Sequence, residues 1–358
     1  MNVLLTGGMG YIGSHITLSL LESKHEVTIL DNLSNSNIEV LSKLKFISSK
    51  EPNFVRGDIL DTELVIKTLK NYKINAVIHL AGLKAVSESV LYPFMYYKNN
   101  VQGAISLLEA MKSCNISNLV FSSSATVYGV PHFLPINEEH PNEPNNPYGR
   151  SKFYIEEILS DLVQSNYDWN FVSLRYFNPV GSHASGLIGD NPNGIPNNLM
   201  PYINQVASGQ YPFLKIFGND YDTPDGTGIR DYIHVEDLSD AHLSALDSID
   251  SNSNLSKGIL NIFNIGTGVG YSVLEIVKAY EKINKLDIPY EIFPRRDGDI
   301  ASSYADPKKA NSMLKWKAKK SIEEMCFSAW NFQKKEPVEF IREDEIPLNK
   351  LFKKPIKP

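Results

Sequence analysis

Tyr148 and Lys152 stand four residues apart in the segment Tyr148-Gly-Arg-Ser-Lys152. On a helix, this spacing puts a phenol and an ammonium group on one face. A free tyrosine titrates at about pH 10, and a neighbouring positive charge favours the phenolate, so the tyrosine could act as a base nearer neutral pH. The spacing alone is weak evidence because it recurs at 211–215 and 304–308. Both of those segments contain a proline, which interrupts a helix, so the first pair is the candidate.

Three serines, Ser122 to Ser124, follow the apolar run that begins at Leu119. At the carboxyl end of a parallel strand, such hydroxyls point into the crevice where α/β proteins bind their ligands. Ser124 could orient a substrate hydroxyl and share its proton, with Ser122 beside a cofactor. The alternative is that the serines only cap a strand.

A glycine-rich loop, Thr6-Gly-Gly-Met-Gly-Tyr-Ile-Gly13, follows the first apolar run and opens a helical pattern. Gly7 and Gly10 would let the backbone turn sharply and approach a pyrophosphate at the helix N-terminus, while Gly13 would allow close helix-to-strand packing. In this context the loop predicts a dinucleotide site. A tight turn without a ligand is the alternative.

Acidic residues at the ends of later strands indicate which dinucleotide the site would bind. Asp31 lies 18 residues beyond Gly13, where a carboxylate can accept hydrogen bonds from ribose hydroxyls. No Arg or Lys stands between Asp31 and Val40 to receive a 2′-phosphate, so NAD is favoured over NADP. Asp58 could bind the adenine amino group or be an ordinary helix N-cap. The small residues of Leu80 to Lys84 could pass close to the cofactor phosphates.

The elements that must position these groups alternate along the first half of the chain. Strands are predicted at 2–5, 26–30, 76–80, 119–122 and 171–174, with a third strand before Asp58, and helices at 10–22, 62–71, 93–113 and 148–164. This alternation predicts an α/β fold with a Rossmann-type, doubly wound parallel sheet. We expect a NAD-binding domain at 1–176 and a smaller α/β C-terminal substrate domain at 177–335, with some segments returning to the first. Residues 336–358 are expected to form a loosely held tail.

Composition excludes several classes of protein. The 358 residues carry 35 basic and 41 acidic side chains, a net charge of −6, which argues against nucleic acid as a partner. The two cysteines, Cys114 and Cys326, fit neither a disulfide framework nor a zinc site, so we expect no metal and a reducing, cytoplasmic location. Neither a secretory leader nor a stretch of 18 apolar residues is found, so no membrane association is expected.

The sequence resembles the extended short-chain dehydrogenase/reductase superfamily and, within it, the UDP-galactose 4-epimerase (UDP-glucose 4-epimerase) family. The resemblance covers about residues 1 to 330. The segments that carry it are, in order, Gly7 to Gly13, Asp31 to Ser36, His79 to Val86, Ser122 to Gly129, Tyr148 to Lys152, Leu174 to Pro179, Gly194 to Pro201, Phe217 to Tyr221, Gly226 to Val235 and Pro294 to Asp299.

The resemblance implies a tightly held NAD that is reduced and reoxidised within each turnover. Tyr148 would take the proton from the sugar 4-hydroxyl, and the 4-keto sugar would rotate before the hydride returns to its other face. Lys152 would lower the tyrosine pKa and hold the nicotinamide ribose, and Ser124 would bridge to the substrate. A homodimer is also implied, through the helices that follow Pro93 and Tyr148.

The resemblance also implies contacts, residue by residue. The implied NAD contacts are Tyr11, Ile12, Asp31, Asn32, Leu33, Ser34, Asn35, Ser36, Asp58, Ile59, Leu80, Ala81, Gly82, Leu83, Lys84, Asn99, Ser122, Tyr148, Lys152 and Phe177. The implied contacts to a UDP-hexose are Lys84, Ser124, Tyr148, Asn178, Asn198, Leu199, Phe217, Arg230, Arg296, Asp299 and Ser303. Forked arginines suit a diphosphate, although a surface ion pair is the alternative for Arg230 and Arg296. Leu80 stands where bacterial members more often have an aromatic residue, a change that could alter packing around the cofactor.

Two questions stay open at this level. Ser303 stands where members restricted to glucose and galactose have a bulky tyrosine, so we expect UDP-GlcNAc and UDP-GalNAc to be substrates as well, unless Ser303 is a neutral loop residue. A dehydratase or decarboxylase of the same superfamily is a rival activity, and a catalytically silent NAD-binding scaffold is another. Ala125 and Thr126 stand where dehydratases have an acidic pair, and the chain keeps both Tyr148 and Lys152.

Overall fold

The structure is a computed structural model that describes residues 1–165, 168–192, 196–251, 258–296 and 298–336. Nearly all of the expected tail, 336–358, lies outside the described residues. Small parts of two motifs, at 193–195 and 297, also lie outside them.

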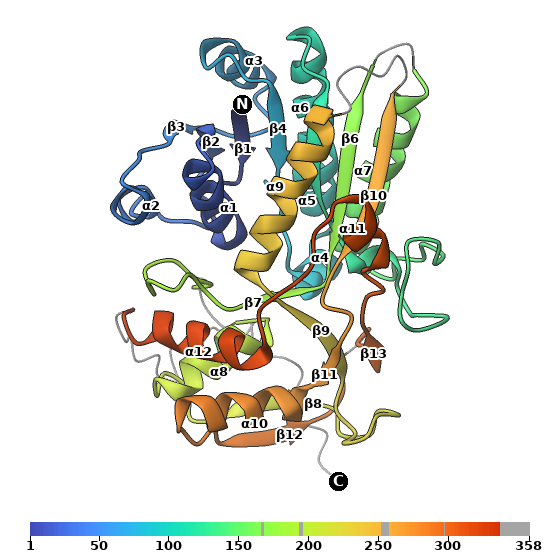
Figure 1. The fold of residues 1–358 in the computed structure, drawn as a ribbon. Helices are drawn as coiled ribbons and strands as arrows, with labels where there is room; N and C mark the ends of the chain where they lie inside the picture. Colours follow the sequence, from blue (N-terminus) through green and yellow to red (C-terminus); the bar gives the residue numbers. More distant parts are fainter. Residues whose placement is uncertain (166–167, 193–195, 252–257, 297, 337–358) are drawn as a thin grey trace.

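A seven-stranded parallel sheet forms the larger lobe (Figure 1). Its strands are β1 (Asn2–Thr6), β2 (Glu26–Asp31), β3 (Asn53–Arg56), β4 (Ala76–His79), β5 (Asn118–Ser124), β6 (Asn170–Tyr176) and β10 (Ile259–Ile265). The spatial order is β10-β6-β5-β4-β1-β2-β3, and every pairing is parallel. The order reverses between β1 and β4, which is where doubly wound folds bind their ligands.

Alternate residues of the strands enter two separate cores. On β1, Val3 and Leu5 point to one face of the sheet and Leu4 to the other, and all three are fully buried. Because both faces are covered by helices, the strands read as nearly continuous apolar runs. These runs made the strands visible in the sequence.

Helices cover the two faces of the sheet. One face carries α1 (Tyr11–Glu22), α2 (Val40–Ser48), α9 (Val235–Ser251) and α11 (Lys308–Met313). The other face carries α3 (Thr62–Asn71), α4 (Val86–Leu91), α5 (Pro93–Tyr96), the π-helix η1 (Tyr97–Gln102), α6 (Gly103–Ser113) and α7 (Pro147–Val163). The short 3₁₀-helix η2 (Ala125–Val127) follows β5. The predicted α/β class and doubly wound parallel sheet are confirmed.

The predicted elements differ from the observed ones mainly at their ends. The helix expected at 93–113 is continuous in the chain but changes to a π-helix over Tyr97–Gln102. As expected, 211–215 and 304–308 are not continuous helices, since β8 begins at Leu214 and α11 begins only at Lys308.

A second lobe lies beyond the carboxyl ends of the sheet, in the lower half of Figure 1. Its elements are β7 (Asn178–Val180), α8 (Leu199–Ala207), β8 (Leu214–Phe217), β9 (Ile229–His234), β11 (Gly270–Ser272), α10 (Val273–Asn284), β12 (Tyr290–Phe293), β13 (Ser302–Ser303) and α12 (Ile322–Gln333). Strand β9 is central, because β11, β13 and β7 all pair with it, while β12 pairs with β8. Capping boxes at Ser272 and Ser321 start α10 and α12.

The chain crosses between the lobes more than once. After β9 in the second lobe, α9 and β10 return to the large sheet, and the chain then enters the second lobe again at β11. Helix α11 packs on β10 before α12 joins the core of the second lobe. The domain boundaries expected from the sequence, 176 and 335, stay a prediction.

Within the described ranges, no helix is long and apolar enough to cross a membrane.

Candidate active site

Tyr148 and Lys152 lie in the first two turns of α7, at the carboxyl edge of the large sheet. The helix starts at Pro147, a residue suited to the first helical position, and Asn146 caps it by accepting a hydrogen bond from the Gly149 amide at 2.9 Å. Lys152 is only 5% exposed, and its Nζ donates to the Ser122 carbonyl at 2.7 Å. This bond ties the helix to the serine-rich end of β5.

The phenol of Tyr148 is partly buried and lies near enough to the Ser124 side chain for its pKa to respond to that group. Burial raises the pKa of Tyr148 above its usual value, and the Ser124 side chain opposes that rise. Lys152 is directed at the Ser122 carbonyl, and burial lowers its own pKa to about 8. The lowering of the Tyr148 pKa by Lys152 that the resemblance implies stays a prediction.

Ser124 caps a helix and also lies near the candidate catalytic tyrosine. Its Oγ accepts hydrogen bonds from the Thr126 amide at 3.2 Å and the Thr126 hydroxyl at 2.9 Å, which caps η2. The same side chain acts on the pKa of Tyr148, so it lies near that phenol. The capping bonds therefore hold the Ser124 hydroxyl in place near the Tyr148 phenol. Capping a helix and acting in the site are compatible roles for Ser124.

The glycine loop between β1 and α1 leaves no space for side chains at two of its positions. A Cβ on Gly13 would lie 2.2 Å from the Gly7 carbonyl oxygen, and a Cβ on Gly7 would lie 2.8 Å from the Ala81 amide nitrogen. Gly7 also has a φ of +72°, which favours glycine. At Gly10, by contrast, a Cβ would meet only the Gly7 oxygen, at 3.5 Å. The loop is thus packed against backbone atoms at Gly7 and Gly13 but has free space at Gly10. Since Gly10 lies at the N-terminus of α1, this space is suited to a pyrophosphate.

We predict opposite consequences for two glycine substitutions in this loop. Gly13→Ala should destabilise the protein by about 3 kcal/mol or more, because its methyl group overlaps backbone atoms that cannot move away. Gly10→Ala should leave the melting temperature nearly unchanged but weaken NAD binding by occupying the space beside the phosphates. Thermal unfolding and NAD titration of the two variants measure both effects, and equal melting temperatures would contradict the prediction.

Asp31 and Asp58 stand at the ends of β2 and β3, at the same edge as the glycine loop. Asp31 accepts hydrogen bonds from the amides of Met9 at 3.0 Å and Leu33 at 2.8 Å and from the Ser36 hydroxyl at 3.0 Å. The carboxylate therefore also orders the loop that follows it. Asp58 accepts from the Asn32 amide group at 3.0 Å and the Leu60 amide at 2.9 Å. The N-cap alternative for Asp58 is wrong, because Asp61 caps α3.

Asn100 fixes the segment Leu80 to Lys84, a role that the sequence analysis missed. This residue is 1% exposed, and its side chain bonds both the amide and the carbonyl of Leu83, at 2.8 and 3.0 Å. Its Nδ2 also lies 3.0 Å from the Ser151 Oγ, next to Lys152. Two adjacent asparagines within an apolar helical pattern, Asn99 and Asn100, were the available signal, since asparagine is a poor helix former.

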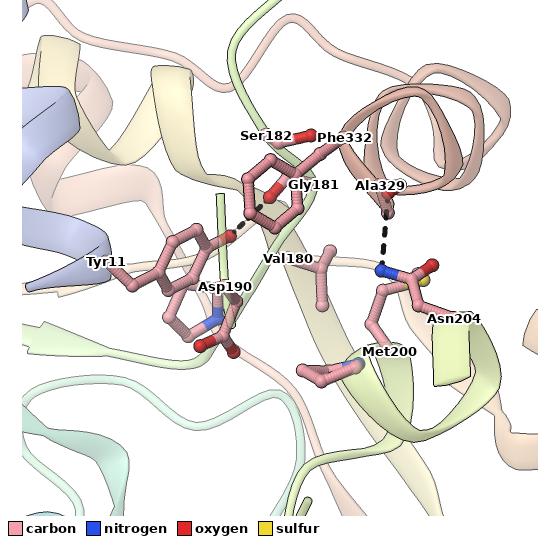
Figure 2. A pocket seen from close by; sticks show the side chains of 11 residues that line it. Tyr11, Val180, Gly181, Ser182, Asp190, Met200, Asn204, Ala329 and Phe332 are labelled. Atoms are coloured by element: carbon pink, nitrogen blue, oxygen red, sulfur yellow. Dashed lines mark hydrogen bonds between the residues drawn. The ribbon is translucent and has the colours of Figure 1, made fainter. Parts of the chain in front are cut away.

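Tyr11 connects the two lobes. Its hydroxyl donates to the Gly181 carbonyl at 2.7 Å, across a cavity of only about 10 Å³ that α8 and α12 also line (Figure 2). Burial raises the pKa of this phenol. The cavity has room for about one water molecule and is far too small for a dinucleotide. The side chain of Tyr11 is thus turned toward the second lobe, which leaves its backbone for a cofactor contact.

The other expected cofactor residues lie around the same edge. Ile12 packs against the core, Ile59 and Phe177 are buried, and Ser122 is 8% exposed. Asn32, Ser34 and Asn35 are exposed in the loop after β2, while Asn99 donates to Asn100 within η1. Lys84 is exposed, and its Nζ lies 4.0 Å from Asp190, a partner that the sequence did not indicate.

The residues expected to hold a nucleotide sugar come from the second lobe. Arg296 forms a two-point ion pair with Asp299, at 2.8 and 3.3 Å, and its guanidinium lies 5.0 Å from the Phe217 ring centre. Arg230 donates to the Ile229 carbonyl at 2.8 Å. Ser303 pairs with Arg230 in the register of β13 and β9, so it is a buried strand residue and not a loop serine. The remaining residues are Asn178, which starts β7, Asn198, which is exposed, and Leu199, which starts α8.

A glycine loop that fits a phosphate and a Tyr148–Ser124 pair, with Lys152 bonded to the Ser122 carbonyl, thus lie at one edge of a doubly wound sheet. That combination defines an α/β enzyme that works with a bound dinucleotide. Across the part of the chain that the structure covers, no three His, Cys, Asp or Glu side chains are grouped to hold a metal ion.

Comparison with known proteins gives the family. The family model described as "NAD dependent epimerase/dehydratase family" matches residues 3–266. UDP-glucose 4-epimerase of Bacillus subtilis is 52% identical over 333 residues, which cover 93% of this chain and 97% of that protein. The enzyme of the same name from Homo sapiens is 50% identical over 345 residues, covering 94% and 98%. The crystal structure of UDP-glucose 4-epimerase from Bifidobacterium longum in complex with NAD⁺ and UDP matches with a TM-score of 0.90 and 47% identity, covering 94% and 99%. The chain belongs to the NAD dependent epimerase/dehydratase family.

Proposed function

We propose that the protein interconverts UDP-hexoses that differ in configuration at C4, UDP-glucose and UDP-galactose in the first place. The observation that carries this proposal is the group Tyr148, Ser124 and Lys152, placed beside a glycine loop that fits a pyrophosphate. The similarity to UDP-glucose 4-epimerases along almost the whole chain supports the same activity.

The residues of the chain divide the work of the reaction. Tyr148 takes the proton from the sugar 4-hydroxyl and later returns it, with Ser124 holding both the phenol and the substrate oxygen. Lys152 orients the nicotinamide ribose, and Gly7, Gly10 and Asp31 hold the rest of the dinucleotide. The cofactor held by these residues would supply a hydride acceptor and donor for C4 of the sugar, and a positive charge that would favour the phenolate of Tyr148. In the second lobe, Arg230 and Arg296 bind the diphosphate while the 4-keto sugar turns.

Product analysis without added cofactor tests the activity. Purified protein mixed with UDP-glucose should form UDP-galactose, because the cofactor is regenerated in every turnover. A stable keto sugar, or no turnover, would contradict the proposal. The dehydratase alternative is disfavoured because η2 carries Ala125 and Thr126, which offer no carboxyl group for the loss of water.

The proposed substrate range includes the N-acetylated pair, UDP-GlcNAc and UDP-GalNAc. Ser303 supports this extension, because a small side chain stands there, next to Arg230 in the sheet register. We predict that Ser303→Tyr lowers kcat/KM for UDP-GlcNAc by about ten-fold or more relative to UDP-glucose, since the added ring would take the volume of the acetamido group.

Ser302→Tyr is the matched control, since neighbouring strand residues point to opposite faces. It should leave the ratio of the two activities unchanged. A wild-type enzyme that epimerises UDP-glucose but not UDP-GlcNAc would contradict the extension.

We also propose a homodimer and a cytoplasmic location. The dimer is supported by an apolar surface on α4, α5 and η1, where Leu91 is 70% and Phe94 is 89% exposed, and by an open groove that Tyr97 and Tyr154 line. Sedimentation at twice the chain mass would support the dimer, and sedimentation at the mass of one chain would contradict it. The location rests on Cys114 and Cys326 both being free thiols.

A further inference from the structure

Tyr221, in the loop after β8, has a buried hydroxyl group that lacks a hydrogen-bond partner within the described residues. The residue is 6% exposed. The ring is nevertheless held firmly. The Arg295 guanidinium stacks on it at 4.1 Å, and the Tyr221 amide donates to the Gly226 carbonyl at 3.0 Å. A Cβ on Gly218 would lie 2.5 Å from the ring, so the chain leaves room for it only with glycine there.

Charged groups surround this phenol. Burial and the Asp299 carboxylate raise the pKa of Tyr221, while Arg295, Arg230 and Arg296 lower it. Arg295 is itself paired with Asp220 at 2.7 Å, so three guanidiniums and two carboxylates lie near this hydroxyl. The remaining net positive charge suits an anionic partner. Arg296 is paired with Asp299 at 2.8 Å, so an anion would compete with that carboxylate for the guanidinium.

A comparison with Tyr211 shows that the charged neighbours of Tyr221, and not its unpartnered hydroxyl, are unusual. Tyr211 is 8% exposed, and its hydroxyl also lacks a hydrogen-bond partner within the described part of the chain. Its ring packs against Tyr202, and burial raises the pKa of its phenol. An unsatisfied phenol is therefore not sufficient to indicate a site. The surrounding charges distinguish Tyr221.

We propose that Tyr221 is a further substrate-binding residue, whose hydroxyl donates a hydrogen bond to a phosphate oxygen of the nucleotide sugar. This inference rests on the proposed function, because it takes a nucleotide diphosphate as the ligand. Tyr221 would add a neutral donor to the two arginines, and it would be positioned before the ligand arrives by Arg295 and Gly218.

Binding of UDP and of uridine to wild-type protein, Tyr221→Phe and Tyr211→Phe tests the inference. Both nucleotides are measured as competitive inhibitors of UDP-glucose epimerisation. Tyr221→Phe should weaken UDP about ten-fold, because the lost hydrogen bond is to a charged group, and should leave uridine unchanged. Tyr211→Phe should bind both as the wild type does. The melting temperature of Tyr221→Phe should not fall, because the hydroxyl has no partner in the free protein.

The other possible results distinguish a failure of the Tyr221 proposal from a failure of the proposed epimerase activity. Unchanged UDP binding in Tyr221→Phe would overturn the role of Tyr221 while leaving the epimerase activity in place. Equal weakening of UDP and uridine would assign the contact to the nucleoside and overturn the phosphate assignment. A fall in melting temperature with unchanged binding would make Tyr221 a structural residue. Absence of epimerisation in the wild-type protein would instead contradict the proposed function itself.

Discussion

Tyr148→Phe should lower kcat for UDP-glucose epimerisation by between about 10² and 10⁴, the usual contribution of a positioned acid-base group. The substitution removes one oxygen and keeps the ring, so the fold should not change. The phenol oxygen that we propose takes the proton from the sugar 4-hydroxyl is lost, together with its interaction with Ser124. Initial rates in both directions of the reaction measure the effect.

Two further measurements test whether the lower kcat of Tyr148→Phe comes from the missing acid-base group and not from lost NAD binding. NAD released by denaturing Tyr148→Phe should match the wild-type amount, because the glycine loop and Asp31 are unaltered. Tyr290→Phe, at an exposed tyrosine of β12, removes the same atom away from the site and should keep full activity. A rate within a few-fold of wild type in Tyr148→Phe would remove the tyrosine from the mechanism.

Lys152→Met should abolish most of the activity, by about two orders of magnitude or more, and should also change how stability depends on pH. The side chain is nearly fully buried, and burial lowers its pKa from 10.5 to about 8. Below pH 8 the folded protein must hold a buried positive charge, which methionine does not carry. Nucleotide-sugar turnover measures the first effect, and urea unfolding of NAD-free protein measures the second.

The sign of the pH effect follows from proton binding. Between the folded pKa of about 8 and the unfolded value of 10.5, the unfolded chain binds more protons than the folded one. The stability of the wild type relative to Lys152→Met should therefore rise across this window, by up to about 3 kcal/mol. Lys67→Met, at an exposed lysine of α3, should keep the wild-type dependence. A constant difference between wild type and Lys152→Met would contradict the burial argument.

Local signals predicted much of the fold and part of the site. The glycine loop, the Tyr-Lys spacing and the serines after Leu119 each depend on a short segment, and the structure brings Lys152 to Ser122 and Tyr148 to Ser124. The parallel strands were visible because both faces of the sheet are buried. The π-helix at Tyr97–Gln102 was not visible, since its apolar spacing is close to that of an ordinary helix.

Contacts between distant segments were the part that the sequence could not supply. Asn100 meets Leu83 and Ser151, and Lys84 meets Asp190, through side-chain geometry that no spacing encodes. The lowering of the Tyr148 pKa by Lys152 stays a prediction, because it depends on the direction of one amino group, which bonds the Ser122 carbonyl. The unsatisfied hydroxyl of Tyr221 is likewise a property of packing.

The return of α9 and β10 to the large sheet limits how enzymes of this shape can acquire new substrates. Since β10 completes the sheet beside β6 and the chain then leaves for the second lobe again, neither lobe is one continuous piece of sequence. A cofactor-binding half and a sugar-binding half therefore cannot be exchanged between relatives by a single recombination event. We therefore expect changes of sugar specificity to come from substitutions within short segments, such as the one proposed for Ser303 in β13, which replace one side chain and keep both lobes intact.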